Sequence, residues 1–236
     1  MNATRSMPIV WQARLAGIAY LLVIGGGLFA QAAVVEAVIV PGDAAETARA
    51  VAAHETLWRW GIAVHLAYLV LAVLADVLLY GFFRPVQATI ARLALVFGVV
   101  SVASEAAILL TLYVPLALLD EGEALAALGT GSQEALAYLA ISLYATGFGF
   151  PLLLFSGFCV LIGVLILRSR LIPHLIGVFM IVAGAAYFVN SLVVIVSPDL
   201  SEVLVPWILL PPFIGELSLA LWLTVKGLHD DGSVAA

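Results

Sequence analysis

The chain has 236 residues, of which 64% are hydrophobic and only 10% are charged, and its formal net charge is −6. A water-soluble domain carries about 25% charged residues, and polar side chains this scarce cannot cover the surface of a soluble fold. The composition therefore indicates an all-α, polytopic membrane helix bundle whose main partner is the lipid bilayer. The acidic balance leaves no basic surface for nucleic acid, so we expect no nucleic-acid partner.

Six segments are long and apolar enough to cross a bilayer as helices, since a crossing needs about 20 apolar residues. The predicted spans are residues 14–38, 57–83, 88–118, 134–167, 171–196 and 206–227. The first span superficially resembles a signal peptide, but its apolar run of about 25 residues exceeds the usual core of about 7–15 residues, so we interpret it as a retained helix. A short surface helix is expected over residues 43–55, capped by Asp43. The chain is expected to form a single membrane domain over residues 1–236.

Two of the predicted spans contain helix breakers. The fourth span is too long for one straight crossing, and Gly147, Gly149 and Pro151 predict a kink, or a lead-in helix followed by the true span. In the sixth span, Pro211 and Pro212 remove two backbone donors. They predict either a plain kink or a helix that restarts near Pro212.

The basic residues sort to one side of the predicted topology. With the N-terminus inside, only Arg49 and Arg59 fall outside, and seven basic residues fall on the cytoplasmic side: Arg5, Arg14, Arg84, Arg92, Arg168, Arg170 and Lys226. Because basic residues are enriched in cytoplasmic loops, the N- and C-termini are both predicted to be cytoplasmic. Trp58, Trp60 and Trp207 lie at predicted outer ends, where interfacial aromatic side chains are expected.

Ionisable side chains inside the spans are the candidates for function, since each costs about 2.5–3.5 kcal/mol to insert at bilayer depth. We single out five of them as candidates: Glu36, His65, Asp76, Glu105 and Glu216. At about 1.5 Å per residue, four of them fall at the midplane or in the outer half and could share one outward-facing polar pocket. Asp76 falls deeper, nearer the cytoplasmic side.

The spacing of His65 and Asp76 predicts that they share one face of the second span. They are eleven residues apart, which is almost three helical turns, and Tyr68, Ala72 and Tyr80 lie near the same stripe. Such a polar stripe indicates a buried or water-lined face. The alternative is that each acid is a protonated hydrogen-bond partner with a structural role only.

Standard catalytic and cofactor motifs are missing from the sequence. Only His65 among the histidines lies deep in a span, since His174 falls at the inner end of the fifth, so a bis-histidine haem is not expected. The lone Cys159 cannot build a thiolate site, and neither His-x-x-x-His nor Cys-x-x-Cys occurs, so we predict no metal and no cofactor. Gly-x-Ser-x-Gly and a phosphate-binding loop are missing as well.

Three functions stay open on this basis. We favour a non-enzymatic membrane protein that binds a small-molecule or lipid-like ligand, or conducts a proton or ion, through Glu216, Glu105 and His65. The second is an intramembrane enzyme with a carboxylate/histidine site. The third is a structural or interaction subunit of a membrane complex.

Several short stretches, in their order and spacing, carry a resemblance to a known family. They are Ala13-Arg14-Leu15-Ala16-Gly17 with Tyr20-Leu21-Leu22, Val40-Pro41-Gly42-Asp43-Ala44, Tyr80 with Arg84-Pro85, Arg168-Ser169 with Ile172-Pro173 and Ile176-Gly177-Val178, Gly184 with Tyr187, and Ile214-Gly215-Glu216-Leu217 with Leu221-Trp222-Leu223 and Val225-Lys226-Gly227. Together they resemble the bacterial membrane family of domain of unknown function 4386 over essentially the whole chain. The resemblance implies a six-helix, multi-pass protein of the bacterial inner membrane with no established activity. It also implies a histidine ahead of Gly147-Phe148-Gly149, where this chain has Ala145, so no role built on that histidine is expected here.

Overall fold

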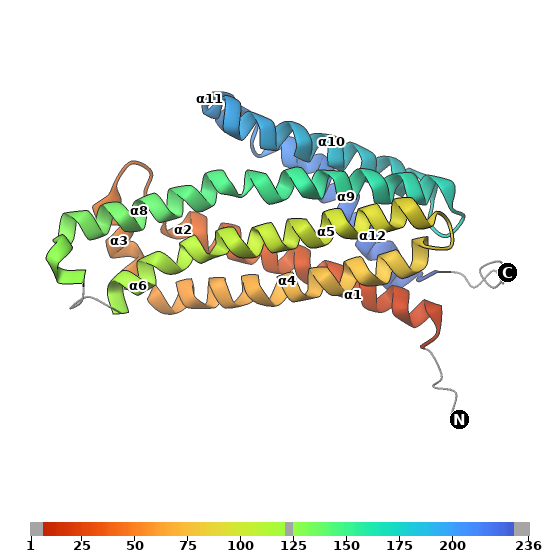
Figure 1. Ribbon diagram of the computed structural model, residues 1–236, viewed down its shortest axis with the longest axis horizontal. Helices are drawn as coiled ribbons and strands as arrows, with labels where there is room; N and C mark the ends of the chain where they lie inside the picture. The colour runs from red at the N-terminus through yellow and green to blue at the C-terminus, as the bar shows by residue number, and fades with distance from the viewer. Residues whose placement is uncertain (1–6, 121–124, 229–236) are drawn as a thin grey trace.

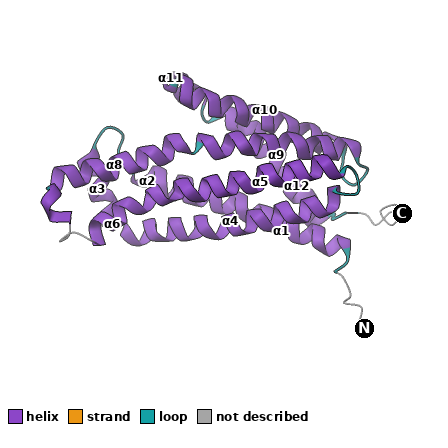
Figure 2. Cartoon of the chain, viewed as in Figure 1, coloured by secondary structure: helices purple, strands orange, loops and turns teal. Residues whose placement is uncertain are grey.

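The computed structural model describes residues 7–120 and 125–228 as a bundle of long helices (Figure 1). The described residues contain helices and loops but no strand (Figure 2). Six of the described helices are long and apolar enough to cross a membrane: Ile9–Gln31, Glu55–Phe83, Ala88–Asp120, Thr130–Arg168, His174–Val196 and Trp207–Val225. The predicted all-α fold with six membrane-crossing helices is confirmed.

The six helices close into a ring in the order of the chain. Its members are α1 (Ile9–Leu28), α4 (Glu55–Phe83), α5 (Ala88–Leu109), α9 (Gly149–Arg168), α10 (His174–Val196) and α12 (Leu210–Val225). Each helix packs against the helices before and after it, and α12 closes the ring by packing against α1. Side chains that point inward from any of the six helices therefore meet inside the ring.

One end of the bundle carries additional helices, and we call it the distal end (Figure 1). There α5 continues through a 3-10 turn (Leu110–Tyr113) into α6 (Val114–Asp120), and α8 (Thr130–Gly147) leads into α9 across a break at Phe148. The helix α3 (Ala44–Ala53) packs against both α6 and α8. The opposite end, where α4 passes into α5, is the proximal end.

Helix lengths show which part of the bundle fits a bilayer. The continuous run Thr130–Arg168 has 39 residues, which at about 1.5 Å per residue is about 58 Å, nearly twice the roughly 30 Å hydrocarbon core. By contrast α10 has 23 residues, or about 35 Å. All six ring helices are present together only in the proximal part, so the hydrocarbon layer fits there and the distal end extends beyond it.

The predicted surface helix over residues 43–55 forms as α3. The carboxylate of Asp43 accepts a hydrogen bond of 2.8 Å from the backbone N–H of Glu46, which caps the helix as expected. One face of the helix is nevertheless buried, since Thr47 and Val51 are 0% and 1% exposed. The Thr47 hydroxyl also binds both the N–H and the carbonyl of Val40, at 3.0 and 3.1 Å, which fixes the loop before α3.

Three of the predicted spans contain a break in the structure. The first begins earlier, at Ile9, and passes through a π-helical segment (Phe29–Val35) into the short α2 (Glu36–Val38). The fourth is interrupted at Phe148, as its glycines and proline predict. In the sixth, α12 begins at Leu210, so the two prolines fall in its first turn, where a missing N–H breaks no helical hydrogen bond.

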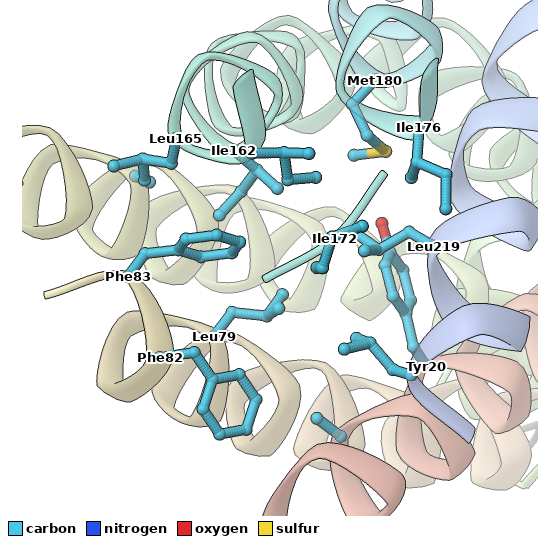
Figure 3. Close-up of a cluster of buried hydrophobic side chains, with 14 of the residues drawn as sticks. Tyr20, Leu79, Phe82, Phe83, Ile162, Leu165, Ile172, Ile176, Met180 and Leu219 are labelled. Atoms are coloured by element: carbon cyan, nitrogen blue, oxygen red, sulfur yellow. The ribbon is translucent and has the colours of Figure 1, made fainter. Parts of the chain in front are cut away.

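Two apolar clusters fill the interior, one at each end of the bundle. The proximal cluster includes Tyr20 of α1, Leu79 of α4, Met180 of α10 and Leu219 of α12 (Figure 3). Close backbone approach contributes to packing here, because a Cβ added to Gly163 of α9 would lie only 2.6 Å from a carbonyl oxygen of α10. The distal cluster packs the π-helical segment, α2 and α3 against α4, α5, α6 and α8.

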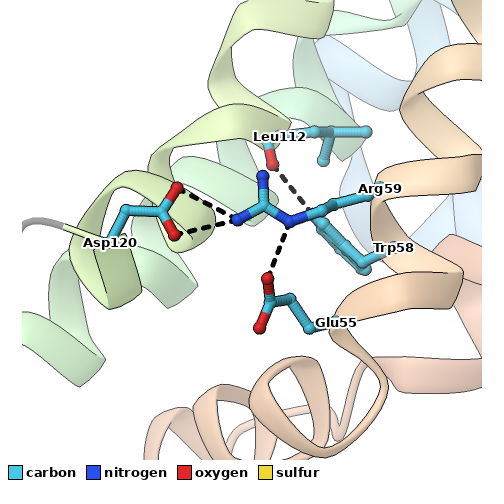
Figure 4. Close-up of polar contacts among 5 residues, drawn as sticks. All are labelled: Glu55, Trp58, Arg59, Leu112 and Asp120. Carbon is cyan, nitrogen blue, oxygen red and sulfur yellow. Dashed lines mark hydrogen bonds and ion pairs between the residues drawn. The ribbon is translucent and has the colours of Figure 1, made fainter.

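The expectation that Trp58 is an interfacial aromatic is wrong. Trp60 and Trp207 are 64% and 70% exposed, but Trp58 is only 1% exposed. Its indole Nε1–H donates a 2.8 Å hydrogen bond to the carbonyl of Leu112 (Figure 4). That carbonyl lies in the 3-10 turn, where it would normally accept from the backbone N–H three residues later. The residue at that position is Pro115, which has no N–H.

The neighbouring Arg59 links two elements at the distal end (Figure 4). Its Nε donates to Glu55 at 2.7 Å, and one terminal nitrogen reaches both carboxylate oxygens of Asp120 at 2.9 and 3.0 Å. The three side chains are 39–48% exposed. They join α4 to α6 at the surface.

Candidate functional site

His65, Tyr68 and Glu105 form a hydrogen-bonded cluster inside the ring. Helix α4 places His65 and Tyr68 one turn apart, and Glu105 comes from α5. His65 Nε2 lies 2.8 Å from Glu105 Oε1, and the Tyr68 hydroxyl donates to the same oxygen while also contacting His65 Nε2. The imidazole and phenol rings stack with centroids 4.5 Å apart. One carboxylate oxygen thus meets two further groups that can carry a proton.

The surroundings of this cluster are closed. The His65 side chain is 2% exposed and that of Glu105 is 15% exposed. Tyr144 of α8 packs edge-on against the imidazole, with ring centroids 6.0 Å apart and planes at 81°. The space beside His65, which Trp58 and Leu112 help to line, is too narrow for a water molecule.

Glu216 lies outside that hydrogen-bonded cluster. It is 7% exposed on α12, and the Tyr187 hydroxyl of α10 donates a 2.6 Å hydrogen bond to its Oε1. The expected single pocket therefore resolves into two groups: the structure brings His65 to Glu105, and it pairs Glu216 with a tyrosine.

Asp76 is buried with one oxygen unpaired. The side chain is 5% exposed, and its Oδ2 has no hydrogen-bond partner among the described residues. The carboxyl group fills the notch left by Gly98 of α5, where an added Cβ would lie 2.2 Å from Oδ2. Tyr20 of α1 is also buried, at 4% exposed, and its hydroxyl lies near the Glu216 carboxyl group.

The predicted stripe on α4 is confirmed. His65, Tyr68 and Asp76 are 2%, 7% and 5% exposed, whereas Leu66 and Val70 on other faces of the helix are 51% and 71% exposed. The polar side chains point into the ring and the exposed aliphatic ones face outward, as in a membrane bundle with a polar interior.

The candidate residues lie at two levels of the ring. Counted from the proximal end of its own helix at about 1.5 Å per residue, His65 lies about 27 Å in and Glu105 about 25 Å in. On the same scale Asp76 lies about 10 Å in and Glu216 about 13 Å in. Glu36 begins α2, but its side chain lies outside what the structure describes, so its place in the site stays a prediction.

Tyrosines are the functional candidates that sequence reasoning missed. Tyr20, Tyr144 and Tyr187 were not assigned to a site, although each lies beside a buried acid or His65. A signal was present, since a tyrosine in an apolar helix needs a partner for its hydroxyl when it is buried. Within the described residues, no group of three or more His, Cys, Asp or Glu side chains lies together as a metal site would require.

A ring of six membrane-crossing helices with carboxyl groups inside it defines an integral, multi-pass membrane protein. The profile of the family described as Domain of unknown function (DUF4386) matches residues 15–227. The chain belongs to this family, which confirms the resemblance drawn from its sequence. Comparisons with curated proteins and with solved structures give no match.

Proposed function

We propose that this protein is a proton-handling protein of the bacterial inner membrane, and that the buried His65–Tyr68–Glu105 cluster takes up and releases the proton. The observation that supports this most directly is the shared oxygen: Glu105 Oε1 contacts both the imidazole and the phenol. Buried histidine and acid side chains linked in this way are typical of proton relays in membrane proteins.

The space around the cluster favours a proton over a small-molecule or lipid-like ligand. The gap beside His65 does not admit a water molecule, so a bound organic molecule has no room there without a change in packing. A proton needs no cavity. Transfer between hydroxyl, imidazole and carboxylate groups in hydrogen-bond contact only shifts which atom carries the hydrogen.

One unpaired carboxyl oxygen favours this function over a purely structural role. A network built only for stability satisfies its buried polar groups, since each unsatisfied one costs about 1–3 kcal/mol. Asp76 Oδ2 is buried and unpaired within the described residues. A buried polar group that lowers stability in this way is expected where the function of the protein requires it.

The proposed orientation places the proximal end, with its arginines at the helix ends, in the cytoplasm. A fluorescent reporter that matures only in the cytoplasm, fused after Lys226, should be bright in cells. A periplasm-dependent enzyme fused at the same residue should be inactive. The reverse pattern contradicts the orientation.

Proton flux tests the proposed function. The purified protein is reconstituted in liposomes that hold a pH-sensitive dye, and a potassium gradient with valinomycin drives proton entry. The wild type should acidify the lumen faster than empty liposomes, and Glu105→Gln should slow this by about tenfold or more, because the amide cannot accept a proton.

Glu134→Gln at the distal end is the matched control and should leave the flux unchanged. Both variants are also compared with the wild type by thermal melting in detergent, so that a folding defect is recognised. A wild type that conducts no better than empty liposomes contradicts the proposal. So does a well-folded Glu105→Gln variant with wild-type flux.

A further inference from the structure

We propose that four arginines at the proximal end, where α4, α5 and α9 meet, bind the phosphate group of an anionic phospholipid. We call them the arginine cluster: Arg84, Arg92, Arg168 and Arg170. One hydrogen bond gathers these arginines, no acidic side chain of the described residues pairs with them, and an exposed apolar stripe leads away from them along α5. The site lies apart from the buried histidine and does not depend on proton transfer.

A single side-chain hydrogen bond brings these arginines together from three helices. Arg84 directly follows α4, and Arg168 is the last residue of α9. A guanidinium nitrogen of Arg168 donates to the side-chain carbonyl of Gln87, which lies in the turn between α4 and α5 (Figure 1). Because Gln87 comes three residues after Arg84 and five before Arg92, the positive charges gather around this one turn. Arg170 adds a fourth charge just beyond the end of α9.

The arginine cluster has no carboxylate to neutralise it within the described residues. At the distal end Arg49 and Arg59 both form ion pairs with acidic side chains. In the part of the chain that the structure describes, the four arginines of the cluster form no ion pair, and all four are exposed. Like charges repel one another, so an anion bound between them relieves that repulsion. A phosphate suits this place, because a planar guanidinium donates two parallel hydrogen bonds to it.

An exposed apolar stripe next to the cluster suits an acyl chain. On α5, Arg92 is followed at helical spacing by Val96, Val99 and Val100, which are 54%, 38% and 44% exposed. These positions share one face of the helix with Arg92, and they extend about 12 Å from it toward the middle of the bundle. A phosphate held at the arginines therefore places its acyl chains along this stripe. A soluble phosphate compound has no use for the stripe, so the ligand is a membrane lipid.

The net charge of the headgroup decides which phospholipid binds. Phosphatidylglycerol carries an uncompensated negative charge on its phosphate, whereas the choline of phosphatidylcholine adds a positive charge that the arginines repel. Attraction of one basic side chain to an anionic lipid surface corresponds to about a fivefold preference. The preference should weaken as salt is added, because the arginines are exposed and their field is screened.

Native mass spectrometry of the full chain tests the site by counting the lipids that stay bound. The wild type, incubated in detergent with equal amounts of phosphatidylglycerol and phosphatidylcholine, should retain the first over the second by about fivefold or more. The double variant Arg84→Gln with Arg92→Gln should lower this preference about threefold or more. The double variant Arg49→Gln with Arg59→Gln removes the same charge from the distal end and should leave the preference unchanged.

Thermal melting of the wild type in detergent is a second measurement, and it needs no variant. Phosphatidylglycerol should raise the melting temperature, and phosphatidylcholine or inorganic phosphate at the same concentration should not. The rise should shrink in about 1 M salt, where the screening length falls to about 3 Å. Equal retention of the two lipids by the wild type overturns the proposal, and so does an equal loss of preference in the two double variants. Stabilisation by inorganic phosphate without any by phosphatidylglycerol overturns the assignment to a lipid.

Discussion

Replacing Gly98 by alanine should destabilise the bundle, and the loss should depend on Asp76. The new methyl group would lie 2.2 Å from Asp76 Oδ2 and 2.8 Å from its Cγ, against 3.1 Å from the nearest atom of Phe158. A carbon and an oxygen that are not bonded need more than 3 Å, so the carboxyl group has to leave its notch. Forcing an extra methyl group into a packed core costs about 1–3 kcal/mol. The better helix propensity of alanine returns up to about 1 kcal/mol.

The matched test is a double-mutant cycle. In an Asp76→Ala background the carboxyl group is gone, so Gly98→Ala should change the free energy of unfolding by less than about 0.5 kcal/mol. The coupling between the two positions should then be about 1 kcal/mol or more. The four proteins are compared by reversible unfolding in mixed micelles with increasing dodecyl sulfate. Gly81→Ala is the control, because a Cβ at Gly81 meets no atom within 4 Å.

Equal losses from Gly98→Ala in the two backgrounds would refute this account of the notch. A carboxyl group that tolerates the methyl group has free space around it. A loss confined to the background with the acid supports the tight packing described above.

Further predictions concern packing and the distal end. Trp58→Phe should lower the free energy of unfolding by about 1–2 kcal/mol because it leaves a buried carbonyl without its donor, whereas Trp60→Phe should have little effect. Gly163→Ala should lower the melting temperature in detergent, because its Cβ would lie 2.6 Å from a backbone carbonyl of α10; an unchanged melting temperature would contradict the close approach of these helices. Arg59→Met should cost less than about 1 kcal/mol, since its ion pairs are exposed, and a larger loss would show that they are not surface pairs.

The fold could be predicted largely from segment length and polarity. A helix that crosses a bilayer satisfies its own backbone, so each span is specified locally, and six apolar runs predict six helices. The stripe of His65 and Asp76 was predictable for the same reason, because helical periodicity alone sets the face. The break at Phe148 followed from the glycines and proline that flank it.

The contacts between helices could not be predicted in this way. Which partner Glu216 meets depends on how α10 and α12 rotate about their axes, and its partner is Tyr187, which no spacing rule connects to it. The position of Trp58 near a helix end wrongly predicts a place at the membrane surface. In fact α4 continues into the distal end, where Trp58 is buried in the distal cluster.

The unequal lengths of the helices have an electrical consequence. A membrane potential falls across the hydrocarbon layer, and the distal end lies beyond it, so nearly all of the voltage drop falls within the proximal 30 Å or so of the ring. The step from the level of His65 to that of Asp76 covers about 17 Å of this distance. At about 2.3 kcal/mol per charge for each 100 mV, a proton on that step gains or loses about 1.3 kcal/mol. A potential of 100 mV therefore acts on this one step about as strongly as a difference of one pH unit.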